Sequence, residues 1–144
     1  MRFIYSILIF LSFYSVQAQP ISITQLEVDK LANPLGLDGG NPDFSWIIKS
    51  DDFNINQTHY QLFVATDKVF SKKSLVWDSG KVNSSESVYV KYQGQSLEYA
   101  TKYYWTVKVW TNQSSRPKQS KIGSWTSGLM GKEQWKSDWI GVKK

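Results

Sequence analysis

The stretch that decides the fold class is residues 97–110, which reads Leu-Glu-Tyr-Ala-Thr-Lys-Tyr-Tyr-Trp-Thr-Val-Lys-Val-Trp. Every second residue from the first leucine onward is apolar, aromatic or threonine, and the lysines occupy positions between them. A period of two over this length is typical of a β-strand with one buried and one solvent-facing side. Aromatic and β-branched residues suit such a half-buried, pleated surface. We therefore expect one central strand, with Tyr99, Tyr103 and Trp105 facing the core.

The rest of the chain adds about six shorter segments with strand-like patterns, separated by turn-rich connections. With 144 residues, 41% of them hydrophobic and 15% aromatic, the chain is long and apolar enough for one domain with a real core. The spacing predicts an all-β antiparallel sandwich of immunoglobulin or fibronectin type III kind, with Trp46 and Trp105 buried. The other expected strands are 21–31, 44–49, 58–66, 75–77, 87–92 and 119–127, and 112–118 is expected to be a polar loop containing Pro117.

Residues 1–18 read as a secretory signal peptide. Arg2 gives the positive start, Phe3 to Val16 is mainly apolar, and Val16-Gln17-Ala18 resembles a cleavage site. The apolar run is shorter than the ~20 residues that a membrane-spanning helix needs. We therefore expect export to the periplasm or the medium, without a stable membrane anchor.

The expected domain covers residues 19–130, and a different segment follows it. Trp135, Trp139 and Ile140 lie in a charged tail, which is unusual for the exposed end of a domain. We interpret residues 131–144 as a linker or as the first strand of a following domain.

Charge and cysteine content exclude several classes of function. Without Arg2 the chain keeps 16 basic and 12 acidic residues, and the lysines are scattered. Nucleic-acid binding usually concentrates basic charge on one face, so we do not expect it. The absence of cysteine removes disulfides, thiolate metal sites and cysteine nucleophiles. We expect no cofactor and no metal ion.

Candidate catalytic groups are few. His59 is the one histidine, and we interpret it as a surface residue on the outer side of a strand. Asp51 and Asp52 are adjacent in a polar loop, where their side chains point apart. Asp78 begins an Asp-Ser-Gly turn, in which its carboxylate is expected to accept a backbone hydrogen bond while Gly80 takes a positive φ. No catalytic residue is assigned.

Three aromatic residues fall on the outer faces of predicted strands: Phe63, Tyr104 and Trp110. Packing against a neighbouring domain would explain them, because an outward aromatic patch often marks an interface. Stacking on sugar rings would explain them too. They are therefore weak candidates for an interface or for a sugar-binding surface.

The expected central strand within residues 97–110 resembles the penultimate strand of fibronectin type III domains through Leu97-x-Tyr99-x-Thr101-x-Tyr103-x-x-x-Val107-x-Val109. Tyr103 matches the residue of that family whose hydroxyl binds nearby backbone, the tyrosine corner. Tyr99 stands where that family commonly has proline, which is a departure from the pattern.

A narrower resemblance is to the N-terminal module of bacterial α-L-rhamnosidases. Six motifs carry it in chain order: Asn33-Pro34-Leu35-Gly36-Leu37-Asp38, Pro42-x-Phe44-Ser45-Trp46, Tyr60-Gln61-Leu62-x-Val64-Ala65, Trp77-Asp78-Ser79-Gly80-Lys81-Val82, Tyr104-Trp105-x-Val107-x-Val109-Trp110 and Trp135-x-x-x-Trp139-Ile140.

The resemblance implies a fragment without the catalytic domain. Those enzymes are large, multi-domain and inverting, and their two glutamates lie in a helical-barrel domain far downstream. The expected role is a non-catalytic accessory module whose partners are downstream domains of the same polypeptide. Two alternatives stay open: a free carbohydrate-binding module, for instance for a rhamnose-containing polysaccharide, and a fibronectin-like module that binds protein.

Overall fold

The computed structural model describes residues 21–129, and all the regular secondary structure in that range consists of β-strands. The all-β antiparallel expectation is confirmed, with nine strands in place of about seven, two of them only two residues long. In the described range no helix is long and apolar enough to cross a membrane. The strands are β1 (Ser22–Val28), β2 (Asp43–Lys49), β3 (Gln57–Ala65), β4 (Leu75–Asp78), β5 (Val82–Asn83), β6 (Val90–Lys91), β7 (Lys102–Thr111), β8 (Ser114–Gln119) and β9 (Gly123–Thr126).

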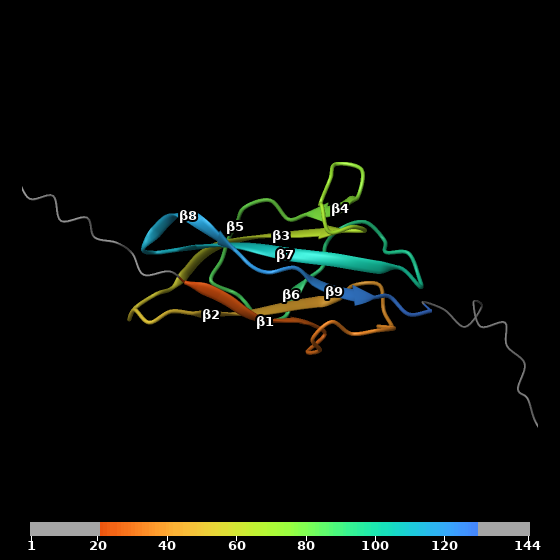
Figure 1. Cartoon of the computed structure of the whole chain (residues 1–144), viewed down its shortest axis with the longest axis horizontal. Helices are drawn as coiled ribbons and strands as arrows, with labels where there is room; N and C mark the ends of the chain where they lie inside the picture. The colour runs from red at the N-terminus through yellow and green to blue at the C-terminus, as the bar shows by residue number, and fades with distance from the viewer. Residues whose placement is uncertain (1–20, 130–144) are drawn as a thin grey trace, which may run out of the picture.

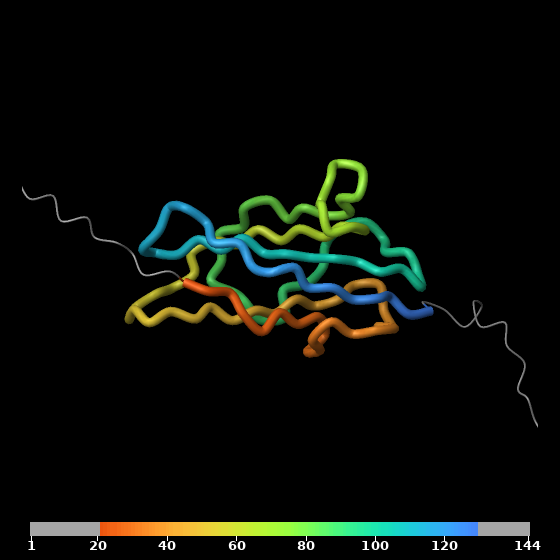
Figure 2. Tube along the Cα trace, in the orientation of Figure 1, coloured from red at the N-terminus to blue at the C-terminus, as the bar shows by residue number. Residues whose placement is uncertain are grey.

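The strands form two sheets that pack face to face (Figure 1). The small sheet has the order β1-β2-β6, and the large sheet has the order β4-β3-β7-β8, with β5 beside β3 and β9 beside β7. All pairings between strands are antiparallel. In the Cα trace, the two ends of the described chain lie at opposite ends of the sandwich (Figure 2).

The core between the two sheets is built largely from aromatic rings. Trp46 of β2, Trp105 of β7 and Trp125 of β9 are each at most 2% exposed, which confirms the predicted burial of the first two. The ring of Phe44 lies 4.8 Å from that of Trp105 and 5.5 Å from that of Trp125, between centroids. Tyr103 stacks on Trp125 at 5.1 Å. Such pairs each contribute about 0.5–1.5 kcal/mol beyond the burial of their area.

β7 begins at Lys102, five residues later than the alternation predicts. Ala100 has a φ of 49°, a left-handed conformation that ends the pleat of a strand. The Ala100 N–H donates to the carbonyl of Gly128, two residues after the end of β9. This hydrogen bond holds the segment before β7 in place, and the strand does not continue through it. Tyr99 is 53% exposed as a result, and the prediction that it faces the core is wrong.

β8 occupies most of the segment that the sequence predicts as a polar loop. Its residue Lys118 pairs with Val109, and Gln119 pairs with Lys108, which makes β8 the edge of the large sheet. An edge strand with both faces near solvent carries the same polar residues as a loop. Such a strand also tolerates Pro117, which has no N–H to donate, because one side of an edge strand has no neighbouring strand. The prediction of a loop is wrong for this physical reason.

β1 contains a bulge that the period-two pattern does not reveal. Thr24 pairs with Ile47 and Glu27 pairs with Ser45, so β1 has one residue more than β2 over this interval. Gln25 takes a φ of 48° within the bulge. The extra residue changes which side chains face inward. β1 ends at Val28, short of the predicted strand 21–31, because Asp29 and Lys30 take φ values of 48° and 68° and turn the chain.

The predicted strand 87–92 shrinks to β6, because Tyr89 takes a φ of 57° and interrupts the extended backbone before Val90. β5 was not expected from the sequence. The predicted strand 119–127 becomes β9 together with the last residue of β8, separated by a short irregular segment. The signal peptide predicted for residues 1–18 and the tail predicted for residues 131–144 lie outside the described residues.

Candidate functional site: the outer face of the large sheet

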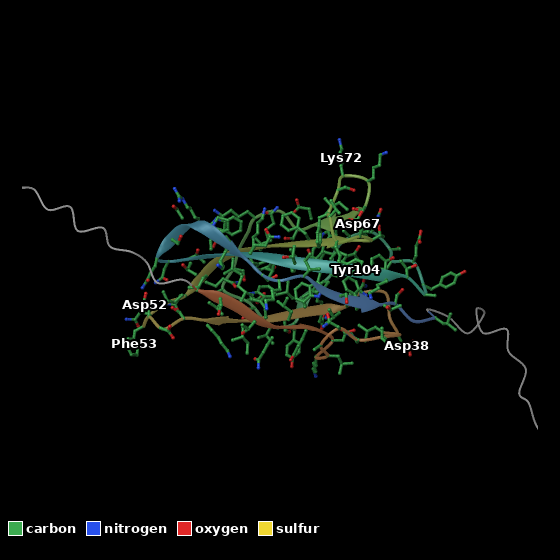
Figure 3. All side chains as sticks on the ribbon, in the orientation of Figure 1. Asp38, Asp52, Phe53, Asp67, Lys72 and Tyr104 are labelled. Atoms are coloured by element: carbon green, nitrogen blue, oxygen red, sulfur yellow. The ribbon has the colours of Figure 1, made fainter. Side chains whose placement is uncertain are left out.

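β3 and β7 place Phe63, Tyr104 and Trp110 on the outer face of the large sheet. Tyr104 pairs with Ala65 at one end of the face, and Trp110 pairs with His59 at the other. Tyr104 and Trp110 are six positions apart along β7, or about 20 Å at the rise of an antiparallel strand. Figure 3 shows Tyr104 on β7 toward the end of the sandwich where the Lys72 loop projects. The structure thus brings these residues to one face but not into one continuous aromatic platform.

Each of these three rings lies under a lysine ammonium group. The distances from Nζ to the ring centroid are 4.9 Å for Lys108 over Phe63, 4.7 Å for Lys81 over Trp110, and 5.6 Å and 5.7 Å for Lys68 and Lys102 over Tyr104. A cation over an aromatic face is attracted by the ring quadrupole. The lysine stems also cover apolar ring surface while the charged ends stay in water. This face is therefore basic more than apolar.

Thr106 interrupts the same face between Tyr104 and Trp110. The sequence pattern places its side chain in solvent, but it is only 1% exposed. Its Oγ1 lies 3.1 Å from the Ser120 Oγ, and Ser120 Oγ also accepts the Val107 N–H at 3.1 Å. Ser120 belongs to the irregular segment between β8 and β9, which is how a residue predicted to face solvent becomes buried.

A shallow depression of about 480 Å³ lies beside Trp110. Its lining comes from β3, from Lys81, from the end of β7 and from the turn into β8. Every lining side chain can make a hydrogen bond, and Trp110 also supplies the flat apolar surface of its indole ring. The full lining is Thr58, His59, Lys81, Trp110, Thr111, Asn112, Gln113, Ser114 and Ser115.

The turn that borders this depression is tied to the loop before β3. Asn112 Nδ2 donates to the Asn54 carbonyl at 2.8 Å, and Asn112 Oδ1 accepts the Asn56 N–H at 3.0 Å. Gln113 Nε2 lies 3.4 Å from the carbonyl of Phe53. Figure 3 shows Asp52 and Phe53 at the far end of the sandwich from Asp38. Two loops thus support each other at this end.

The outer side of the small sheet carries a different surface, which we call the small-sheet patch: Ile47, Val88 and Tyr89. These side chains are 44%, 55% and 52% exposed. They border a hollow of about 120 Å³, and Lys30 Nζ lies 5.3 Å from the Tyr89 ring centroid. Sequence reasoning missed this patch, because Val88 and Tyr89 were assigned to a longer alternating strand.

Tyr103 closes the turn that precedes β7. Its hydroxyl accepts the Glu98 N–H at 2.8 Å and lies 3.5 Å from the Glu98 carbonyl. Ser127 Oγ donates to the same carbonyl at 2.6 Å and accepts the Thr101 N–H at 3.0 Å. Burial is the main cause that raises the pKa of Tyr103. The hydroxyl is therefore a neutral structural group that fixes the backbone five residues upstream.

Gln57 is a buried polar residue that sequence reasoning missed. Its Oε1 accepts the Trp46 indole N–H at 3.0 Å, and its Nε2 donates to the carbonyls of Ser84 and Glu86 at 3.1 Å and 2.7 Å. A register irregularity between Gln57 and His59 turns this side chain inward, against the alternation set by the rest of β3. No local sequence signal marks such a residue.

Two of the carboxylates in the described range, those of Asp67 and Asp78, accept hydrogen bonds from nearby backbone amides. The Ser74 hydroxyl, followed by the amides of Val69 and Phe70, holds the pKa of Asp67 below its usual value, the opposite of what a general acid requires. Asp78 Oδ1 accepts the Gly80 N–H at 2.8 Å, and Gly80 has a φ of 64°, which confirms the predicted turn.

The structure also shows the surroundings of His59 and whether metal-ligating side chains come together. His59 Nδ1 lies 3.1 Å from the neighbouring Thr58 Oγ1 on the outer side of β3. Among residues 21–129, no three histidine, cysteine or acidic side chains lie close enough together to hold a metal ion.

The described domain is similar to part of several α-L-rhamnosidases. The chain is 35% identical over 148 residues to an α-L-rhamnosidase of Formosa agariphila, covering 96% of this chain and 16% of that protein. It matches the Streptomyces avermitilis α-L-rhamnosidase complexed with L-rhamnose at a TM-score of 0.81 and 37% identity, over 86% of this chain and 12% of that one. For the α-L-rhamnosidase of Dictyoglumus thermophilum the TM-score is 0.78, the identity 38% and the shares 85% and 14%.

These comparisons cover only a small part of each relative, between 12% and 16% of its length. The profile of a family described as "Rha78A-like, N-terminal immunoglobulin domain" matches residues 23–131, which takes in all of the strands apart from the first residue of β1. That description names an immunoglobulin domain, so the narrower fibronectin type III assignment stays a prediction. The chain belongs to the family of Rha78A-like N-terminal immunoglobulin domains.

Proposed function

We propose that this chain is a non-catalytic accessory module of an exported α-L-rhamnosidase and that it packs against the domains that follow it. The observation that carries the proposal is the family membership together with the coverage: nearly the whole chain aligns with only 12–16% of its α-L-rhamnosidase relatives. The rest of each relative is available for catalysis. The small-sheet patch gives the module an apolar surface for contact with a following domain.

The small-sheet patch suits domain packing better than the outer-face aromatics predicted from the sequence. Phe63, Tyr104 and Trp110 are half-buried under lysines, and covering them would require those ammonium groups to lose water. Of the three patch residues, Tyr89 alone lies under a lysine, Lys30, whereas the aliphatic side chains of Ile47 and Val88 are 44% and 55% exposed. Burying such apolar area is the main favourable term in association.

Two measurements test the assignment as an accessory module. The purified 144-residue chain is expected to release no nitrophenol from p-nitrophenyl α-L-rhamnoside, and measurable turnover would contradict a non-catalytic role. The reading frame in the source DNA is expected to continue past Lys144 for several hundred codons. A stop codon there, followed by unrelated sequence, would contradict the accessory role.

The packing surface is tested in that longer gene product. Val88→Thr in the patch is expected to lower the unfolding temperature of the module in the long protein but not in the 144-residue chain. Val69→Thr is the matched control, because Val69 is 80% exposed on the loop before β4, away from the patch. Equal effects of the two substitutions in the long protein would contradict packing through the patch.

Export belongs to the same proposal. The sequence of residues 1–18 supports it, and mass spectrometry of the protein recovered outside the cytoplasm is expected to give a mature chain that begins at Gln19. Recovery of an unprocessed chain in the cytoplasm would contradict export.

A further inference from the structure

Lys81 borders the depression beside Trp110 and, within the described residues, forms no ion pair with an acidic side chain. Lys81 Nζ lies 4.7 Å from the centre of the Trp110 indole, and within residues 21–129 the one ion pair joins Lys91 to Asp43. The ring quadrupole attracts the ammonium group, but it leaves N–H donors available toward the depression. A positively charged donor set without a carboxylate partner is suited to bind an anionic group.

The surroundings of this cation are those of a small polar ligand site. Trp110 supplies one flat, half-buried aromatic surface, and the remaining lining consists of hydroxyl, amide, imidazole and ammonium groups. A volume of about 480 Å³ falls within the range of small-molecule sites. Asn112 fixes the border of the depression through its two hydrogen bonds to the loop before β3, so part of the ordering cost is met before a ligand binds.

We propose that this depression binds an acidic sugar unit, such as the uronic acid of a polysaccharide. Lys81 pairs with the sugar carboxylate, the indole of Trp110 contacts the apolar C–H surface of the sugar ring, and the amides and hydroxyls of the turn meet its hydroxyl groups. The choice of a saccharide over an acidic peptide rests on the proposed function, because the module would belong to an enzyme that acts on glycans. The anionic character rests on Lys81 alone.

Binding is measured by two-dimensional nuclear magnetic resonance on the 144-residue chain with the linear trimer of galacturonic acid. The indole N–H signal of Trp110, identified from the Trp110→Phe variant, is expected to shift saturably with a millimolar dissociation constant. Lys81→Met keeps the aliphatic stem over the ring and removes the charge. It is expected to weaken binding about fivefold, the ratio for loss of one exposed ion pair, without a change in unfolding temperature.

Lys108→Met is the matched control. Lys108 also lies over an aromatic ring of the same sheet face, but it does not line the depression. Its substitution removes the same charge and is expected to leave the dissociation constant within about twofold. Equal weakening by both substitutions would show diffuse attraction to a basic surface and would overturn the proposal.

Other results would also overturn it. These are the absence of a saturable shift at Trp110, equal affinity for the methyl-esterified trimer, and equal affinity for a trimer of glutamate, which would indicate an acidic peptide instead. None of them would alter the rhamnosidase assay or the reading frame, so failure of this site is distinguishable from failure of the proposed function.

Discussion

Removing the hydroxyl of Tyr103 measures how much its hydrogen bond to the turn before β7 contributes to the free energy of unfolding. In Tyr103→Phe the ring keeps its stacking on Trp125, whose centroid lies 5.1 Å away, while the Glu98 N–H loses its acceptor at 2.8 Å. A typical hydrogen bond of this kind stabilises a protein by about 1 kcal/mol net. Glu98 is exposed, so water can replace part of the lost hydrogen bond to its N–H. We therefore expect a loss of about 1 kcal/mol rather than the larger cost of a fully buried N–H without an acceptor.

The measurement is urea denaturation of the 144-residue chain followed by circular dichroism, with thermal unfolding as a second readout. A loss of about 1 kcal/mol corresponds to a fall of about 4 °C in Tm for a domain of this size. Tyr104→Phe is the control, because it is the same substitution one residue along β7, on the half-buried outer face, and it is expected to stay within about 0.5 kcal/mol. Equal stability of Tyr103→Phe and the wild type would refute the role assigned to this hydroxyl.

Three further outcomes are expected. Gln57→Leu leaves the Trp46 indole N–H and two carbonyls without their partner, and it is expected to cost about 3 kcal/mol in urea denaturation; a change below about 1 kcal/mol would contradict the buried network. Gly123→Ala places a methyl group 2.5 Å from Trp105 Nε1, so we expect about 1–3 kcal/mol of destabilisation by the same assay, and an unchanged midpoint would show that the indole moves freely. Burial raises the pKa of Tyr92 to about 12 from 10.0, so stability is expected to hold below pH 10.0 and to fall as pH rises toward about 12, measured by urea midpoints alongside tyrosinate absorbance; a flat profile there would contradict the shift.

The class of fold could be predicted because its signal is local. Alternation along β3 and β7 requires only that successive side chains point to opposite sides, and the aromatic residues on the inner side then bury themselves whichever strand lies opposite. Trp46 and Trp105 illustrate this, since both were expected in the core and both are 1% exposed. The Asp-Ser-Gly turn was equally predictable, because Asp78 and Gly80 meet its requirements within three residues.

Where backbone conformation departs from a regular period, the pattern misleads. Ala100 and Tyr89 adopt positive φ without being glycine, and nothing in their own side chains favours it. The surrounding hydrogen bonds impose those conformations, and they shift the start of β7 and shorten β6. Gln57 turns inward for a comparable reason, since the irregularity in β3 depends on how β3 and β7 pair.

The candidate site was predicted only in part. The sequence identified the outer-face aromatics Phe63, Tyr104 and Trp110, but it could not place Lys81 over the indole, because these two residues lie on strands and turns that meet only in the large sheet. The depression beside Trp110 and the small-sheet patch both arise from segments far apart in the chain.

By itself, then, the sequence determined that residues 97–110 contain a central strand of an antiparallel sandwich and that Tyr103 and Trp105 of this stretch are buried. The tertiary structure alone decided that this strand begins at Lys102, that β8 forms its edge, and which cation covers each outer ring. The reason is physical: alternation is a property of one strand in contact with water on one side, whereas edges, turns of positive φ and contacts between distant side chains depend on the register of several strands at once.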